Sequence, residues 1–192
     1  MPGRQAKVIA PSALAAMLRH VNKHHPNPTR SRAIILLSVK AGLRAAEIAK
    51  LEWPMVLNAN GQVGRILEID DRIAKKGSGR RVPMHSDLLD ALVALLKLSE
   101  PYGPVILSRR GAAMRPNSIV CWFVSLYQEM GLEGCSSHSG RRTFITNAAR
   151  LVHKAGGSLR DVQILAGHRS IEMTQRYIDG DSAAQHRLVA LL

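Results

Sequence analysis

Apolar positions spaced for helices run through most of the 192-residue chain. Residues 11–24 place Leu, Met and Val three and four positions apart behind Ser12, an N-cap candidate, which predicts an amphipathic helix. Residues 27–42 carry a proline near their start, close at Gly42 and are apolar nearly all round, which is typical of a buried central helix. A short helix over 44–51 is expected to follow directly.

The hydrophobic period changes from helical to alternating in one region. Residues 61–72 and 80–85 are expected to form two strands, joined through the basic hairpin segment 75–79. Pro83 within the second run indicates an edge strand. Six further helices are expected, the first with Ser86 as its N-cap: 86–99, 115–131, 138–154, 158–166, 170–178 and 183–191.

These elements predict an α+β fold that is mainly α, a helical domain with a small antiparallel sheet. The chain has the length of one domain and shows no internal repeat, low-complexity tract or clear linker. We therefore expect a single domain over residues 1–192.

The charge narrows the choice of partner. The 27 Lys and Arg residues exceed the 14 Asp and Glu residues, which gives a net charge of +13. Such a surplus favours a polyanion, and nucleic acid above all, because each neutralised phosphate releases counterions. A membrane surface is the weaker alternative, since no apolar run approaches the ~18 residues of a spanning helix. A basic helical RNA-binding protein would also explain the charge.

The cysteine and histidine spacing indicates neither a disulfide framework nor a metal site. Cys121 and Cys135 have no CxxC spacing, and we expect ordinary reduced thiols in a cytoplasmic protein. The basic N-terminus resembles a signal peptide only faintly, because Pro11 and Arg19 interrupt its apolar run.

Two segments in the first half carry candidate chemistry, each with a simpler structural explanation. Arg44 follows the buried helix and suits a bidentate clamp on phosphate, with Glu47 one turn on to orient its guanidinium. A surface Arg–Glu pair explains the same spacing. Lys75 and Lys76 lie in the hairpin, where an ammonium group can act as a general acid or simply face solvent.

Two segments in the second half add an anion-binding pattern and a tyrosine. His138 and Arg141 are three residues apart at the start of a helix, where the helix dipole favours an anion. His168 lies after Gly167, a C-cap candidate, and Tyr177 follows it by nine positions (177 − 168 = 9). The alternatives are a capping segment for the first pair, and a dipole-stabilised histidine and a core tyrosine for the second.

Together, "AGLRAAEI", "KKGSGRRVPM", "HSGRRTFITNAA" and "SLRDVQILAGHRSIEMTQRY" resemble the catalytic domain of the tyrosine recombinases, or phage-type integrases. The resemblance runs from the helix near residue 11 to the C-terminal helix. It implies a metal-independent enzyme without cofactors, which breaks and rejoins DNA strands through a 3′-phosphotyrosyl intermediate during integration, excision or inversion.

The resemblance also implies a role for each residue. Tyr177 would be the nucleophile, Arg44 and Arg141 would bind the scissile phosphate, and the general acid would be Lys75, with Lys76 as the alternative. His138 would assist proton transfer, His168 would hydrogen-bond the phosphate, and Glu47 would support Arg44.

The chain departs from the family pattern in places. Gly140 stands where the family usually has an apolar residue and is expected to loosen helix packing, and Arg142 replaces a more usual histidine without a role in the chemistry. Only about 30 residues precede the first catalytic helix, too few for the family's separate N-terminal core-binding domain. DNA binding is therefore expected to be weaker or to need accessory DNA-bending proteins. The alternative is that the chain is a fragment of a longer protein.

The expected partners are double-stranded DNA and further copies of the chain, as a tetramer on two sites, in the cytoplasm of a bacterium beside its nucleoid. The helix over 183–191, with an apolar face ending in "LVALL", would pack on a neighbouring subunit or equally on its own core. The rival function is a catalytically inactive DNA-binding regulator or architectural protein on the same fold.

Overall fold

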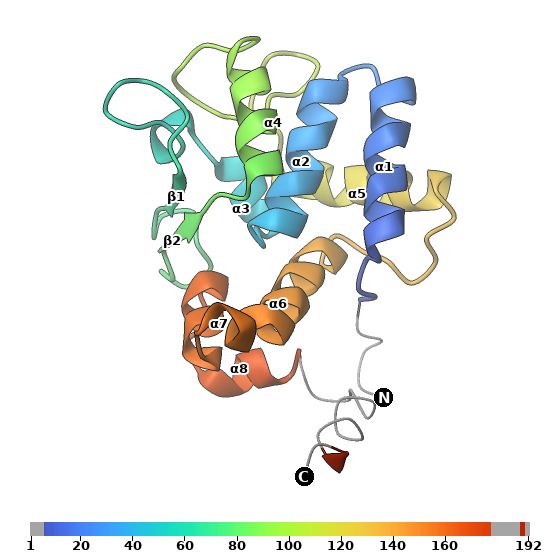
Figure 1. Cartoon of the computed structure of the whole chain (residues 1–192). Coiled ribbons are helices and arrows are strands. Elements are labelled where there is room, and N and C mark those ends of the chain that lie inside the picture. The colour runs from blue at the N-terminus through green and yellow to red at the C-terminus, as the bar shows by residue number, and fades with distance from the viewer. Residues whose placement is uncertain (1–5, 178–188, 191–192) are drawn as a thin grey trace.

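A buried central helix, α2 (Pro28–Lys40), organises the molecule, as the sequence predicts. The computed structural model describes residues 6–177 and 189–190 (Figure 1). In it α2 packs against α1 (Pro11–His24), α4 (Ser86–Leu96) and α6 (Ser139–Leu151). The side chain of Asn27 caps α2 by accepting a hydrogen bond of 3.0 Å from the backbone N–H of Arg30.

The small sheet is antiparallel, as predicted, but shorter. Strand β1 (Ile66–Ile69) pairs with β2 (Arg80–Pro83) in a register that sets Leu67 opposite Val82. Alternate positions face inward, so Leu67 and Val82 are buried. Residues 61–65 stay outside the ladder, and Val63 instead makes an isolated bridge to Leu57. The connection between the strands therefore spans residues 70–79 rather than the hairpin tip alone.

Two helix starts differ from the expected caps. Helix α1 begins at Pro11 with Ala10 as its N-cap, so Ser12 lies inside the first turn. Proline at the first helical position has the required φ and no N–H group to satisfy. Helix α4 is capped by His85, whose Nδ1 accepts a hydrogen bond of 3.1 Å from the backbone N–H of Asp87, rather than by Ser86.

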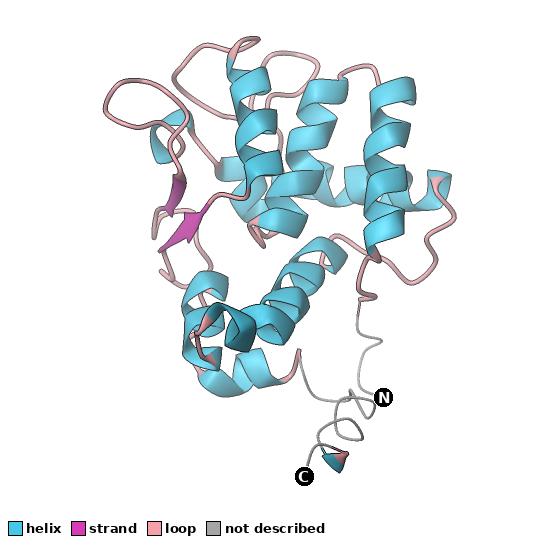
Figure 2. Ribbon diagram, in the orientation of Figure 1, coloured by secondary structure: helices cyan, strands magenta, loops and turns pink. Residues whose placement is uncertain are grey.

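The remaining helices complete the fold, with the small sheet at one edge, α1 to α5 beside it, and α6 to α8 grouped together below them (Figures 1 and 2). Their bounds are α3 (Ala45–Lys50), α5 (Pro116–Glu129), α7 (Leu159–Ala166) and α8 (Ile171–Gln175), with the 3-10 helices η1 (Trp53–Met55) and η2 (Val152–Ala155). The main core lies among α1 to α5, and a smaller apolar cluster lies between α6 and α7. The mainly helical α+β class is confirmed, whereas the helix expected over 183–191 lies outside the described residues except for 189–190.

Gly140 tightens helix packing, contrary to the expectation that it loosens it. A Cβ atom at this position would collide with the side chain of Ser38 on α2, at 2.8 Å from its Cβ atom, and would lie 3.2 Å from its backbone carbonyl carbon. Glycine therefore lets α6 approach α2 more closely than any other residue would. That approach sets the position of the first turn of α6, which carries two of the candidate site residues.

Within the described residues, no helix has both the length and the apolar character needed to cross a bilayer.

Candidate active site

One pocket of about 470 Å³ brings together side chains from across the chain. Its wall includes all six candidate catalytic residues: Arg44, Lys75, His138, Arg141, His168 and Tyr177. They come from the start of α3, the β1–β2 connection, the start of α6, the α7–α8 turn and the turn that follows α8. Because these segments lie far apart in the sequence, only the tertiary fold assembles the pocket.

The carboxylate of Glu47 organises the arginine side of the pocket. Its Oε1 accepts from Nη1 of Arg44 at 2.9 Å and from Nη1 of Arg80 at 3.0 Å. Its Oε2 accepts from the backbone N–H of Arg44 at 2.8 Å and from Nη2 of Arg80 at 3.0 Å. The predicted Arg44–Glu47 contact is thus confirmed, and Arg80 adds a bidentate pair that the sequence reading did not identify.

Glu47 remains ionised even though it is buried. Burial alone would raise the pKa of its carboxyl group, but hydrogen bonds and charge from Arg80 and Arg44 outweigh burial and lower the pKa to about 2. Arg80 also donates from Nε to the carbonyl of Leu165 at 2.9 Å, which ties β2 to α7. The network therefore fixes the orientation of the Arg44 guanidinium and joins α3, β2 and α7 beside the pocket.

Arg141 is held by two backbone carbonyls. Nη1 donates to Gly42 at 2.7 Å and Nη2 donates to Ala166 at 2.6 Å. Burial, reinforced by the charges of Arg44 and Arg80, lowers its pKa to about 10, so the guanidinium is still charged at neutral pH. The guanidinium groups of Arg44, Arg80 and Arg141 are buried or half-buried, and the carboxylate of Glu47 balances only one of their three charges. The remaining positive charge suits a phosphate group.

His168 is a buried, neutral imidazole. Burial and the charges of Arg141, Arg44 and Arg80 lower its pKa to about 4. Its Nδ1 shares a hydrogen bond of 2.9 Å with Oγ1 of Thr174. When the Thr174 hydroxyl donates, the proton of the neutral ring lies on Nε2, which makes Nε2 a hydrogen-bond donor.

Tyr177 lies half-buried against the same pocket. Its ring stacks on that of His168, with centroids 5.4 Å apart and an interplanar angle of 24°. The guanidinium carbon of Arg142 lies 5.9 Å from the centroid of the tyrosine ring. The tyrosine also packs against the small apolar cluster of α6 and α7. It is therefore a packing residue as well as a candidate nucleophile.

The structure distinguishes between the two candidate lysines. Both lysines are exposed, but Lys75 lines the pocket, whereas Lys76 has a positive φ of 61° and is not part of the pocket wall. The loop reaches the pocket because Gly167 allows it close: a Cβ there would lie 3.1 Å from the carbonyl oxygen of Ser78 and 3.0 Å from Cδ of Arg80. Gly167 has a φ of 61° and caps α7, as predicted.

His138 is the exposed N-cap of α6, and Arg141 lies within the first turn. Both line the pocket, so the predicted pairing at a helix N-terminus is confirmed as geometry. The pocket wall also includes Arg142, which the sequence analysis named without giving it a role in the chemistry, and four residues that the analysis did not identify: Ala6, Ser136, Met173 and Arg176. The sequence did contain a signal that the Arg80 side chain faces inward, because Arg80 lies two residues before the inward-facing Val82 on the same strand. Arg142 and Arg176 could have been suspected only because each is next in sequence to a predicted site residue, Arg141 and Tyr177 respectively.

Sequence comparison places the chain among known proteins. The phage integrase family matches residues 7–184. The tyrosine recombinase XerC of Rhizobium meliloti is 32% identical over 160 residues, which are 80% of this chain and 46% of the relative. XerC of Actinobacillus pleuropneumoniae is 31% identical over 162 residues, 81% of this chain and 49% of the relative. The chain thus spans about half the length of these curated relatives.

Solved structures share the fold. The XerA recombinase superposes with a TM-score of 0.74 at 20% identity, covering 99% of this chain and 65% of that one. The Tn1549 transposon integrase, in complex with a circular intermediate DNA, gives a TM-score of 0.73 at 19% identity, covering 97% and 67%. With a family match over nearly its whole length, the chain belongs to the phage integrase family.

Proposed function

We propose that this chain is the catalytic domain of a site-specific DNA recombinase that cleaves and rejoins strands through a 3′-phosphotyrosyl intermediate. The observation that carries the proposal is the convergence of Arg44, Lys75, Arg141, two histidines and one tyrosine on a single pocket. Membership of the family supports it, because the relatives are named tyrosine recombinases.

The arginines would bind the non-bridging oxygens of the scissile phosphate. Arg44 and Arg141 are charged and already oriented by Glu47 and by backbone carbonyls. Little reorganisation is then needed when charge builds up on the pentacoordinate transition state, which is where preorganised donors contribute most. The neutral His168 would add one hydrogen bond from Nε2.

The covalent step would exchange one phosphodiester for another. The Oη atom of Tyr177 attacks phosphorus while the bond to the 5′ oxygen breaks, which leaves the DNA 3′ end on the tyrosine. His138 assists removal of the tyrosine proton, and Lys75 protonates the departing 5′ oxygen. A new 5′-hydroxyl reverses the step, so the reaction needs neither a cofactor nor a metal ion.

The experiment uses nicked suicide duplexes that contain sites selected by this chain from a random DNA library. We expect a covalent protein–DNA adduct with the wild type and none with Tyr177→Phe, which still binds the DNA. Tyr102→Phe is the matched control, since Tyr102 is exposed and outside the pocket. Binding without adduct formation by the wild type would favour the catalytically inactive DNA-binding protein instead.

The assignment of the general acid has its own test. Lys75→Ala should slow adduct formation by ~10²–10⁴-fold, the usual contribution of general acid catalysis. A substrate with sulfur in place of the bridging 5′ oxygen should restore the rate, because a thiolate leaves without protonation. Lys76→Ala is the control and should cleave both substrates at the wild-type rate; the reverse pattern would assign the role to Lys76.

The proposed partners follow from the same reaction. Strand exchange needs two duplexes and therefore several copies of the chain, so we propose a tetramer on two DNA sites, assisted by DNA-bending proteins and acting at the nucleoid. Light scattering of the chain with a two-site duplex should detect four chains per complex. A complex that contains one chain per site and never joins two sites would contradict this part of the proposal.

A further inference from the structure

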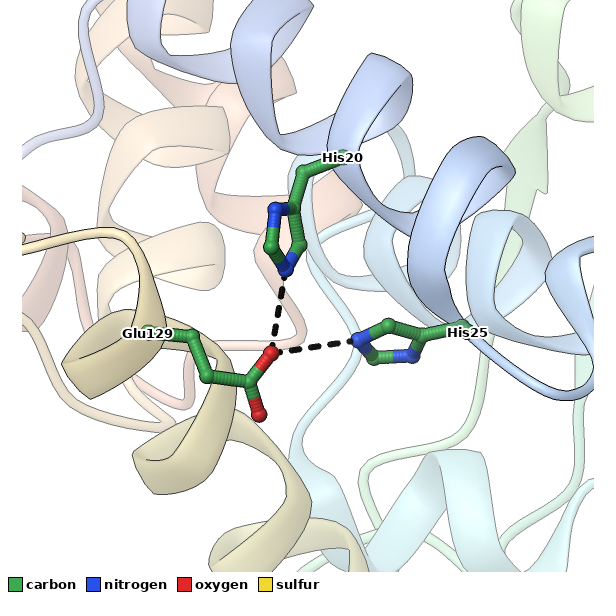
Figure 3. A group of neighbouring side chains, drawn as sticks. All are labelled: His20, His25 and Glu129. Atoms are coloured by element: carbon green, nitrogen blue, oxygen red, sulfur yellow. Dashed lines mark hydrogen bonds and ion pairs between the residues drawn. The ribbon is translucent and has the colours of Figure 1, made fainter.

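Two histidines and a glutamate meet outside the pocket, where α1 passes the end of α5 (Figure 3). His20 lies on α1, His25 is its C-cap residue, and Glu129 ends α5. One carboxylate oxygen, Oε2 of Glu129, lies 3.0 Å from Nε2 of His20 and 3.6 Å from Nε2 of His25. Figure 3 shows both rings turned toward this oxygen. None of the three side chains lines the candidate active site.

We infer that His20, His25 and Glu129 form a binding site for a divalent transition-metal ion of the zinc class. Imidazole nitrogen and carboxylate oxygen are zinc donors, with metal–ligand distances of about 2.0–2.2 Å. Tetrahedral geometry at that distance separates two donor atoms by roughly 3.3–3.6 Å. The observed separations of 3.0 and 3.6 Å lie close to this range, and all three donor atoms lie within 4.8 Å of one another. Small side-chain shifts are enough to admit an ion.

The surroundings of His25 provide a second, independent observation. Its Nδ1 lies 3.0 Å from the hydroxyl oxygen of Ser31, a buried residue. The ring of Trp122 meets the imidazole edge-on, with centroids 5.7 Å apart and an interplanar angle of 80°. When Nδ1 donates its proton to Ser31, the lone pair of Nε2 faces His20 and Glu129. An outer hydrogen bond that selects the tautomer and the ring orientation is the usual arrangement around a metal-bound histidine.

The site is open to solvent on its carboxylate side. The side chain of Glu129 is 47% exposed, and those of His20 and His25 are 23% and 12% exposed. An ion can therefore enter, and three protein donors leave one tetrahedral position for water. The ring of His24 stands beside that of His20, with centroids 4.9 Å apart, but His24 is not among the three residues that bring donor atoms together.

A bound ion would connect segments that are far apart in the chain. His20 and Glu129 are 109 positions apart, and the ion would link the end of α1 to the end of α5. An ion that binds only the folded protein raises the free energy of unfolding by RT ln(1 + c/Kd), where c is the ion concentration, so the gain grows with the logarithm of the ion concentration above Kd. The ion would therefore have a structural role, separate from the chemistry proposed for Tyr177.

The test titrates the tag-free chain with Zn²⁺ by calorimetry and with Co²⁺ by visible absorption. We expect one ion per chain and the absorption of a four-coordinate cobalt site. Glu129→Gln and His25→Ala should each weaken the affinity at least about tenfold, and Ser31→Ala, which removes only the outer hydrogen bond, by about tenfold. His24→Ala is the matched control on the same helix and should stay within about threefold of wild type.

Thermal unfolding supplies a readout that does not depend on spectroscopy. Added Zn²⁺ should raise the Tm of the wild type and of His24→Ala but not that of Glu129→Gln, whose side chain is exposed enough for the variant to fold. The inference is overturned if no ion binds, or if Glu129→Gln and His25→Ala bind as tightly as the wild type. Loss of binding in His24→Ala but not in Glu129→Gln would also overturn it and would indicate a His20–His24 pair on α1.

Discussion

At the scale of single residues, the charge of Glu47 matters most, because one carboxylate accepts hydrogen bonds from two arginine side chains and a backbone N–H group. Removing one partner from a buried ion pair typically costs about 3–5 kcal/mol, since it leaves a buried charge uncompensated. Exposed ion pairs contribute only about 0–1 kcal/mol. Strand β2 carries both kinds of ion pair. Arg80, on its inner face, forms the buried pair with Glu47, and Arg81, on its outer face, forms an exposed pair with Glu68.

Glu47→Gln should therefore lower the free energy of unfolding by about 3 kcal/mol in urea denaturation. The matched control is Glu68→Gln, which removes the exposed partner of Arg81 and should cost less than about 1 kcal/mol. Equal losses in the two variants would contradict the buried network.

The charge of Glu47 also makes the stability of the wild type depend on pH. As pH falls from 4.5 toward 2, the contribution of Glu47 to the free energy of unfolding should be lost, because its pKa of about 2 in the folded protein lies below the ordinary 4.5.

His168 gives a second pH prediction, in which a base stays uncharged in the folded protein, whereas Glu47 is an acid that stays charged. Its folded pKa of about 4 lies below the ordinary 6.5, so the unfolded chain binds a proton that the folded protein does not. As pH falls from 6.5 to 4, the free energy of unfolding should decrease by about 3 kcal/mol from this residue. An NMR titration, assigned with His168→Gln, should show no change in the His168 ring between pH 5.5 and 8. A midpoint near 6.5 would contradict the buried, neutral imidazole.

At the scale of elements, the close approach of α6 to α2 depends on the absence of a side chain at Gly140. Gly140→Ala gains about 1 kcal/mol of helix propensity, but overpacking typically costs about 1–3 kcal/mol. We expect net destabilisation of about 1 kcal/mol and slower adduct formation, because α6 carries His138 and Arg141. Urea denaturation and the suicide-substrate assay measure the two effects.

A double-mutant cycle separates packing from propensity at this contact. Ser38→Gly removes the two side-chain atoms that the new methyl group would meet most closely, so Gly140→Ala should be less destabilising in that background than in the wild type. Additive effects of the two substitutions would mean that this contact does not limit how closely α6 approaches α2.

At the scale of the whole molecule, the net charge of +13 should dominate the strength of DNA binding. If ~6–10 phosphates are contacted, the affinity should fall by ~10³-fold or more between 50 and 200 mM salt. Fluorescence anisotropy with a labelled duplex measures the slope. An affinity that does not change with salt would contradict binding through the basic surface, and the Tyr177→Phe variant should keep the wild-type slope because it leaves the charge unchanged.

Much of the fold was predictable because it is encoded locally. The helices over 11–24, 27–42 and 115–131 were predicted to within about two residues at each end, since apolar spacing, proline and glycine mark their limits. The strands were predicted too long, because pairing is limited by the partner strand and not by β propensity. The caps Ala10 and His85 were missed because neither residue type is a usual N-cap.

The candidate site was predictable as a set of residues but not as an arrangement. The resemblance to the family was enough to name the six candidate positions, because the order of the motifs can be seen in the sequence alone. By contrast, the preference for Lys75 over Lys76 at the pocket comes from the path of the β1–β2 connection beside Gly167. Arg80 was not identified because an arginine in a basic hairpin is ordinarily exposed. Its position in phase with Val82 was a sequence signal for an inward side chain, but its partners, Glu47 and the carbonyl of Leu165 on α7, are known only from the structure.

Sequence alone thus determined the class of fold, the basic charge and the identity of the candidate catalytic residues, because periodicity, composition and motif order are properties of the chain itself. Tertiary structure alone decided which groups are buried, which arginines share Glu47, and that His20 and His25 meet Glu129 across 109 and 104 positions (129 − 20 and 129 − 25). Burial and proximity set pKa values and ligand geometry, and both arise only when distant segments pack together.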